Sequence, residues 1–79
     1  MTMKMYSLKD RLNGFTTPIP LASDEVAERW FMEMRTENIT VKLNPQDFEL
    51  WYMGEFDTET GVMTDNENRK EVVYGKADV

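Results

Sequence analysis

The sequence contains no cysteine and no histidine among its 79 residues. It can therefore form no disulfide and no Cys/His cluster for a structural metal, which are the usual cross-links of small domains. The same two absences exclude Ser-His-Asp, Cys-His and Cys/His-bound zinc catalysis. We expect a non-enzymatic protein with no catalytic residue, no metal site and no cofactor. Close packing or self-association has to supply its stability.

Long apolar runs are also missing. No segment approaches the ~20 apolar residues that a membrane-spanning helix requires. Residues 1–12 are interrupted by the charged side chains of Lys4, Lys9, Asp10 and Arg11, which is not the pattern of a signal peptide. We expect a protein of the cytoplasm that has no membrane partner.

Positive charge is scarce, because 9 Lys and Arg stand against 15 Asp and Glu and give a formal net charge of −6. Residues 1–21 contain three basic residues and one acidic residue, whereas residues 44–79 contain three basic and nine acidic residues. An acidic chain is repelled by nucleic-acid phosphates unless its basic residues gather on one face. The first third of the chain is the part where they can do so.

One amphipathic helix is predicted from Asp24 to about Thr36. Ser23 is a good N-cap, and two acidic residues follow it at the positive end of the helix dipole. The apolar stripe at helical spacing consists of Val26, Ala27, Trp30, Phe31 and Met34. This stripe predicts which side of the helix faces the core.

The clearest predicted strand covers residues 48–56. Alternation places Phe48, Leu50, Tyr52 and Phe56 on one of its faces and Glu49, Trp51, Met53 and Glu55 on the other. Residues 3–8 are expected to form a first strand, residues 62–64 a returning strand, and residues 71–74 a further edge strand. Residues 16–20 are expected to be an extended irregular connection, and residues 39–43 a loop or a poor strand.

These elements predict an α+β protein with a single small domain over residues 1–79. Its order is β-α-β-β, with a possible fourth strand, and one helix packs on an antiparallel or mixed sheet. We expect the core to lie within about residues 3–64, followed by an acidic C-terminal segment.

One helix cannot cover two faces of a sheet, so the face that carries Trp51 and Met53 needs another partner. A second copy of the chain, most simply in a homodimer, is the favoured partner. Alternatively, residues 18–21 or the C-terminal tail fold over this face.

Three stretches carry a family resemblance. They are Tyr6–Arg11 followed by Gly14 and Phe15, Ala27–Phe31, and Asn44–Leu50 followed by Gly54-Glu55-Phe56-Asp57. Over about residues 3–64, the chain resembles the small nonstructural protein of gokushoviruses, tailless phages of the microvirus group with single-stranded DNA genomes. The resemblance implies a non-virion protein of the host bacterium's cytoplasm with a role in single-stranded DNA synthesis or single-stranded DNA binding. It implies no catalytic residues.

The basic residues within the matching motifs are Lys9, Arg11 and Arg29. Lys4 can join them if the first strand lies beside the helix. With Phe15, Trp51 or Tyr52 available to stack on bases, these side chains are the candidate nucleic-acid contacts. Two alternatives stay open. The basic residues are simply solvated, or the acidic C-terminal half docks on a basic replication or capsid protein and the chain never touches DNA.

Overall fold

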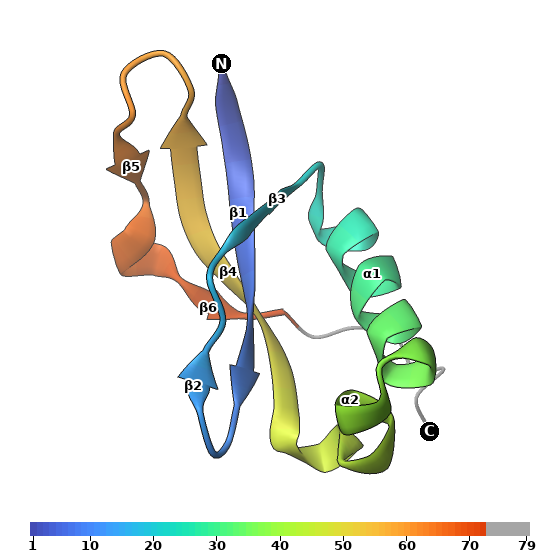
Figure 1. Cartoon of the computed structure of the whole chain (residues 1–79). Helices are drawn as coiled ribbons and strands as arrows, with labels where there is room; N and C mark the ends of the chain where they lie inside the picture. Colours follow the sequence, from blue (N-terminus) through green and yellow to red (C-terminus); the bar gives the residue numbers. More distant parts are fainter. Residues whose placement is uncertain (73–79) are drawn as a thin grey trace.

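The computed structural model describes residues 1–72 and contains one antiparallel sheet with two helices (Figure 1). The strands are β1 (Thr2–Asp10), β2 (Gly14–Phe15), β3 (Ile19–Leu21), β4 (Phe48–Asp57), β5 (Met63–Thr64) and β6 (Lys70–Glu71). The helices are α1 (Asp24–Glu37) and α2 (Ile39–Leu43), with short 3-10 turns at Pro45–Asp47 and Asn66–Asn68. The predicted α+β class is confirmed, and every strand pairing is antiparallel.

Two long strands form the centre of the sheet. β1 and β4 pair along almost their whole length, from Thr2 opposite Asp57 to Asp10 opposite Phe48. The short strands β2 and β3 lie along the outer edge of β1, and β5 and β6 lie along the outer edge of β4. The predicted edge strand at residues 71–74 begins one residue earlier than expected, and residues 73 and 74 lie outside the described part of the chain.

α1 begins where the sequence predicts, because the Ser23 side chain accepts a hydrogen bond from the Val26 N–H at 3.2 Å. The helix continues to Glu37, and Asn38 ends it by donating its N–H to the carbonyl of Met34. The Asn38 side chain then accepts from the N–H groups of Thr40 and Val41, which starts α2. The expectation of a loop or poor strand at residues 39–43 is therefore wrong, since Asn38 caps a second helix.

The proline segment is more regular than predicted. Residues 16–18 are irregular as expected, but Ile19–Leu21 form β3 and pair with residues 4–6 of β1. Pro20 is tolerated in this strand because β3 lies at the edge of the sheet, where a missing N–H does not interrupt a ladder on both sides.

The core lies between the sheet and α1. Its buried residues are Tyr6, Leu8, Ala27, Phe31, Leu50, Tyr52 and Val72, with Leu21, Trp30, Met34 and Phe48 packed against them. The apolar stripe of α1 therefore faces the core as predicted. Phe48, Leu50 and Tyr52 of β4 also face the core as predicted. We call the opposite side of the sheet the outer face.

A β-bulge in β4 changes which residues reach the outer face. Met5 pairs with Gly54, whereas its neighbour Tyr6 pairs with Tyr52, so Met53 is an extra residue in β4. The backbone of Gly54 has a φ of 126°, which a residue with a Cβ seldom adopts. The bulge therefore resets the alternation of side chains beyond Met53.

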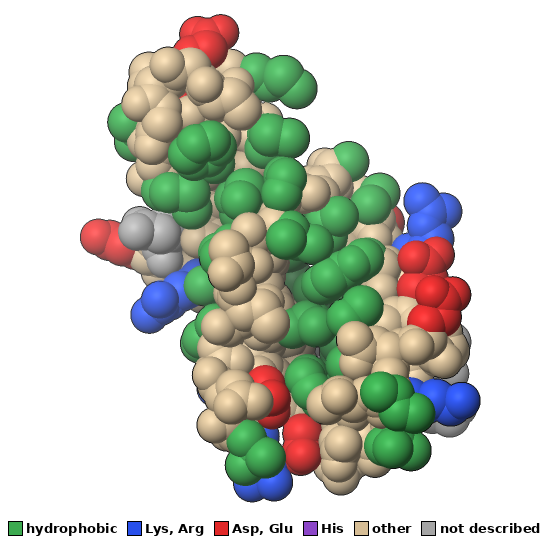
Figure 2. All heavy atoms as spheres, in the orientation of Figure 1, with side chains coloured by type: hydrophobic (Ala, Val, Ile, Leu, Met, Phe, Trp, Pro, Cys, Tyr) green, Lys and Arg blue, Asp and Glu red, His purple; other side chains and the backbone are tan. Residues whose placement is uncertain are grey.

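Phe56 and Glu55 are the residues whose predicted faces are wrong. Phe56 pairs with Met3 on the outer face, and Glu55 pairs with Lys4 on the helix side. In the orientation of Figure 1, hydrophobic side chains form a band down the middle of the molecule, with charged side chains toward its margins (Figure 2). Within the described residues both helices lie on the core side of the sheet, as the sequence predicts for a single amphipathic helix.

Candidate nucleic-acid interface

Three side chains meet on the outer face near the end of β1. Lys9 pairs with Phe15 of β2, and Trp51 of β4 lies opposite Ser7, two residues before Lys9 on the same face. The rings of Phe15 and Trp51 stand edge to face, with centroids 5.4 Å apart and planes at 86°. The Lys9 ammonium nitrogen lies 5.8 Å from the Phe15 centroid and 5.6 Å from the Trp51 centroid. We call these three residues the Lys9 cluster.

A tight turn brings Phe15 across from Lys9. The Asp10 carboxylate accepts hydrogen bonds from the Leu12 N–H at 3.0 Å and from the Asn13 side chain at 2.8 Å. Gly14 has a φ of 81°, a conformation that glycine adopts without steric strain. The chain therefore reverses directly after β1, and Asn-Gly is a dipeptide typical of such turns.

A buried serine holds the chain beyond this turn against the sheet. The Ser7 hydroxyl donates to the Thr16 carbonyl at 2.7 Å and lies 3.1 Å from the Thr16 hydroxyl. The Leu8 N–H donates to that same Thr16 hydroxyl, and the Thr16 N–H donates back to the Leu8 carbonyl. These bonds attach the segment after Phe15 to β1 and so fix the position of the aromatic pair.

The polar edge of the indole is already bonded. Trp51 Nε1 donates to Glu49 Oε1 at 3.0 Å, and Glu49 lies opposite Lys9 in the ladder. Phe15 keeps 43% of its surface exposed, while Lys9 and Trp51 are half-buried. The cluster therefore presents an aromatic ring and an ammonium group to solvent, next to a carboxylate.

Arg11 lies beside the cluster. A shallow hollow of about 130 Å³ is lined by Lys9, Arg11, Gln46, Asp47 and Glu49. Arg11 Nε donates to Asp47 Oδ1 at 3.0 Å, and the Arg11 side chain is otherwise exposed. Gln46 reaches this hollow from the 3-10 turn before β4, a position that no pattern in the sequence connects with Lys9.

Two of the basic candidates lie elsewhere. Lys4 pairs with Glu55 on the helix side of the sheet. Arg29 is exposed on α1, in the other layer of the molecule. The structure therefore brings together Lys9, Arg11 and Phe15 and separates them from Lys4 and Arg29.

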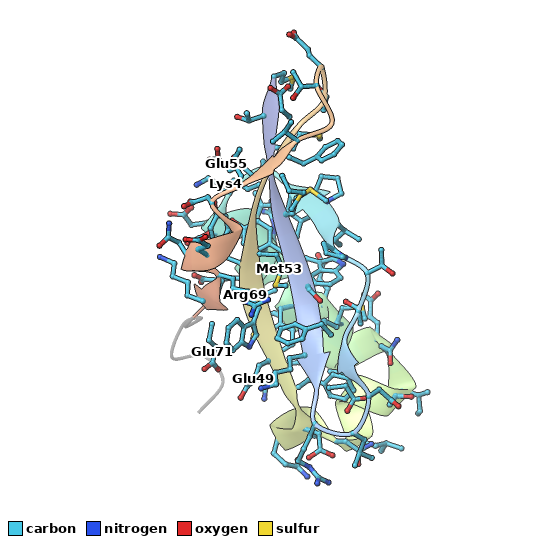
Figure 3. The ribbon with its side chains drawn as sticks, turned by 90° about the vertical axis from the view of Figure 1, so that its left-hand side faces the viewer. Lys4, Glu49, Met53, Glu55, Arg69 and Glu71 are labelled. Atoms are coloured by element: carbon cyan, nitrogen blue, oxygen red, sulfur yellow. The ribbon has the colours of Figure 1, made fainter. Side chains whose placement is uncertain are left out.

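Of the two residues expected to mediate self-association, Met53 is half-buried at the bulge and lies on the outer face, which Figure 3 views directly. Trp51 lies on the same face but is partly covered by Phe15. Arg69, Glu71 and Glu49 are also labelled on this side of the molecule.

Tyr52, a further stacking candidate, belongs to the core. Its ring lies 5.8 Å from that of Tyr6, and its hydroxyl donates to Asp65 at 3.1 Å. The Tyr6 hydroxyl donates to Asp24 at the start of α1. Burial, followed by the bond to Asp65, raises the pKa of Tyr52 to about 12, and burial raises the pKa of Tyr6 further. Both tyrosines are therefore protonated donors at neutral pH and attach α1 and the Asp65 turn to the sheet.

Residues 1–72 contain no group of three acidic or other metal-ligating side chains placed to hold a metal ion. No helix in this part of the chain is long and apolar enough to cross a membrane.

A family model, that of the Phage ORF5 protein, matches residues 3–77. The chain belongs to this phage protein family. No curated protein and no solved structure matches it. The matched range includes β1 from Met3 onward, the turn to β2, and β4, and thus all three residues of the Lys9 cluster.

Proposed function

We propose that this member of the Phage ORF5 family is a nonstructural accessory protein of a gokushovirus-like phage and that its Lys9 cluster binds single-stranded DNA. The observation that carries the proposal is the meeting of Lys9, Phe15 and Trp51 on one face of the sheet. Family membership supports the phage origin, and the aromatic-basic geometry supports the ligand.

Binding of single-stranded DNA by the Lys9 cluster does not depend on the base sequence of the DNA. An exposed phenyl ring stacks on any base, and such stacking contributes about 1–3 kcal/mol per base in single-strand binders. The Lys9 ammonium attracts the adjacent phosphate. Arg11 has guanidinium N–H groups beyond the one that bonds Asp47, and these can reach a second phosphate.

The size of the cluster limits affinity. With two phosphates neutralised, the logarithm of the binding constant falls against the logarithm of salt concentration with a slope of about −1.4. The formal net charge of −6 opposes binding further. We therefore expect weak binding of single strands that is strongest at low salt.

Fluorescence anisotropy with a labelled oligothymidine of about 15 nucleotides tests the proposal at about 20 and 150 mM NaCl. Lys9→Gln and Phe15→Ala are each expected to weaken binding about fivefold or more at low salt. Lys42→Gln, which removes an equal charge from the exposed side of α2, is the matched control and should leave binding almost unchanged. Absence of binding at low salt, or equal losses for Lys9→Gln and Lys42→Gln, contradicts the proposal.

Arg29→Gln separates the structural assignment from the sequence-based one. Because Arg29 lies in the helical layer, its substitution should have no more effect than that of Lys42. A large loss would place the nucleic acid on α1 instead of the outer face.

The second candidate function is a protein-interaction module that docks its acidic half on a basic replication or capsid protein. The concentration of nine acidic residues in residues 44–79 favours it. A pull-down from infected cells distinguishes the two candidates, since recovery of nucleic acid without a protein partner argues against the interaction module.

A further inference from the structure

A further basic residue, Arg69, lies on the outer face at the side of the sheet away from Phe15. It follows the second 3-10 turn and has an extended backbone, with φ −60° and ψ 142°. The chain then continues into β6, in which Glu71 pairs with Trp51. Successive side chains of an extended chain alternate between faces, so Arg69 shares the outer face with Glu71, whereas Lys70 between them faces the helix side.

Arg69 and Lys9 lie on opposite sides of the Trp51 indole. Continued by one residue, the register between β4 and β6 places Arg69 opposite Met53, and Figure 3 shows these two residues next to each other. Arg69 is therefore a diagonal neighbour of Trp51, and such neighbours lie about 7–8 Å apart, within reach of a long side chain. Across the ladder, the Lys9 ammonium lies 5.6 Å from the indole centroid. The indole thus has a basic residue on each side.

The Arg69 guanidinium is available to a ligand. Arg69 is exposed, and it takes part in no ion pair within residues 1–72. Two carboxylates share this part of the outer face. Glu49 accepts the hydrogen bond of the indole N–H, and Glu71 is exposed opposite Trp51. Glu71, two residues from Arg69, therefore opposes the approach of a phosphate.

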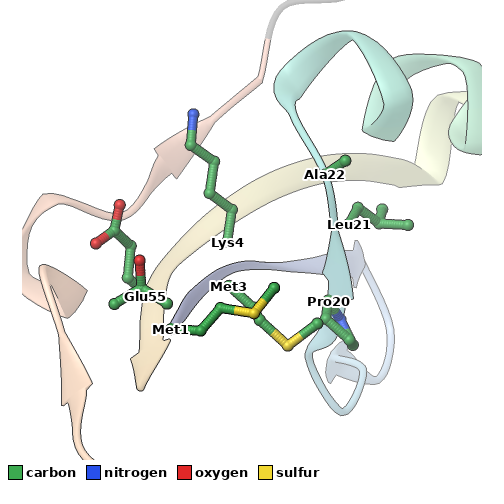
Figure 4. Close-up of a pocket in the computed structure, with 8 residues that line it drawn as sticks. Met1, Met3, Lys4, Pro20, Leu21, Ala22 and Glu55 are labelled. Atoms are coloured by element: carbon green, nitrogen blue, oxygen red, sulfur yellow. The ribbon is translucent and has the colours of Figure 1, made fainter. Parts of the chain in front are cut away.

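Two lysines near Arg69 face the other side of the sheet. Lys4 helps to line a cavity of about 430 Å³ together with Glu55 and Ala22 (Figure 4). Lys70 and Lys4 both line a second hollow of about 260 Å³, to which Asp24 of α1 also contributes. The sheet therefore separates both lysines from the Trp51 indole.

We propose that Arg69 is a further phosphate contact of the single-strand site, so that the nucleic acid crosses the outer face from the Lys9 cluster over Trp51 to the side of β6. This role rests on the proposed function, because Arg69 extends the site that begins at the Lys9 cluster. The half-buried Met53 lies between Trp51 and the far end of this path and offers the bases an apolar surface.

The length of the path defines the ligand further. From Lys9 to Arg69 it covers two strand spacings across the sheet and about four residues along β4, which is roughly 16 Å. Several nucleotides are needed to span it, as in single-strand binders with sites of about four nucleotides or more. The ligand class is therefore an extended single strand and not a mononucleotide.

The salt dependence of binding measures the number of phosphate contacts. Each phosphate neutralised on a single strand contributes about −0.7 to the slope of the logarithm of the binding constant against the logarithm of salt concentration. Contacts by Lys9, Arg11 and Arg69 give a slope of about −2.1, whereas the first two alone give about −1.4. Arg69→Gln is expected to return the slope to about −1.4 and to weaken binding of the labelled oligothymidine about fivefold at about 20 mM NaCl.

Lys70→Gln is the matched control, because it removes an equal charge from the next residue, on the opposite face. It should leave the slope and the affinity almost unchanged, and Arg69→Lys should retain most of the affinity because a lysine also binds phosphate as a point charge. Equal behaviour of Arg69→Gln and Lys70→Gln overturns the role of Arg69, while the proposed function survives if Lys9→Gln still weakens binding. Absence of wild-type binding at low salt overturns both.

Glu71→Gln provides a test of opposite sign that does not depend on weakening the site. Removal of the carboxylate beside Arg69 is expected to tighten binding about threefold at low salt. Glu33→Gln, which removes an equal charge from an exposed position on α1, is the control and should have a smaller effect. Equal effects of the two substitutions would place the strand away from β6 and overturn the proposed path.

Discussion

Phe15 stands at 86° to Trp51, with 5.4 Å between the ring centroids, and so joins the hairpin after β1 to the middle of β4. The two residues are 36 positions apart in the chain, and only the antiparallel pairing of β1 with both β2 and β4 brings them together. The contact between Phe15 and Trp51 therefore depends on the fold. It also holds the hairpin after β1 in a fixed position against β4.

Phe15→Ala is expected to lower the free energy of unfolding by about 1–2 kcal/mol. An edge-to-face aromatic pair contributes roughly 0.5–1.5 kcal/mol beyond the burial of its area, and Phe15 is half-exposed. Urea denaturation measures the change. Leu12→Ala, in the same hairpin but exposed, is the control and should change stability by less than about 0.5 kcal/mol. Equal effects of the two substitutions would contradict this account of the contact.

Deletion of Met53 is expected to leave the sheet folded. Met53 is the extra residue of the bulge, so its removal keeps Tyr52 opposite Tyr6 and Gly54 opposite Met5. Deletion of Glu55 is the control, because it turns Phe56 toward the helix side and is expected to lower the thermal midpoint strongly. Circular dichroism during heating compares the two deletions. The bulge assignment is wrong if the Met53 deletion is the more damaging one.

Ser23→Ala is expected to destabilise the protein by about 1 kcal/mol, because it removes the acceptor for the Val26 N–H at the start of α1. Ser23→Asp preserves an acceptor at the same position and should retain most of the stability. Urea midpoints of the two variants provide the measurement. Equal losses would show that the cap is not the cause.

Stability is expected to decline in alkaline solution as the buried tyrosines ionise. An unfolded tyrosine has a pKa near 10, whereas burial and the bond to Asp65 raise that of Tyr52 to about 12. The folded chain thus binds the phenol proton of Tyr52 more tightly than the unfolded chain does. The contribution of this proton to the free energy of unfolding is complete below about pH 10 and is lost as the pH rises through about 12.

Tyr52→Phe tests this origin of the alkaline decline. At pH 7 the variant loses the hydrogen bond to Asp65 and should be less stable by about 0.5–1.5 kcal/mol. Its decline above pH 10 should be shallower, so the two unfolding free energies converge with rising pH. Parallel declines would exclude Tyr52 as a source of the effect.

Much of the fold could be predicted because its signals are local and long. α1 has a cap and a five-residue apolar stripe, and β4 has clear alternation. α2 could not be found this way, because a five-residue helix with Val41 as its buried residue shows no period and depends on the Asn38 cap. The bulge is defined by the register between β4 and β1, and this register cannot be deduced from the sequence of β4 alone.

The candidate site, like the fold, could be predicted only in part from the sequence. The Asn13-Gly14 turn predicts that Phe15 returns toward Lys9, but the approach of Trp51 requires the β1–β4 register. The sequence could have predicted that Lys4 and Lys9 lie on different faces of the sheet. The two residues are an odd number of positions apart in one strand, so alternation sends them to opposite faces.

The ladder between β1 and β4 also determines the order in which the molecule can fold. Its outermost pair joins Thr2 to Asp57, so the first strand made during synthesis completes its pairing with its central neighbour only after residue 57 has been made. Closing so long a loop is entropically unfavourable, and α1 alone is too short to be stable in water. Folding is therefore expected to be late, cooperative and slower than that of a helical protein of equal length.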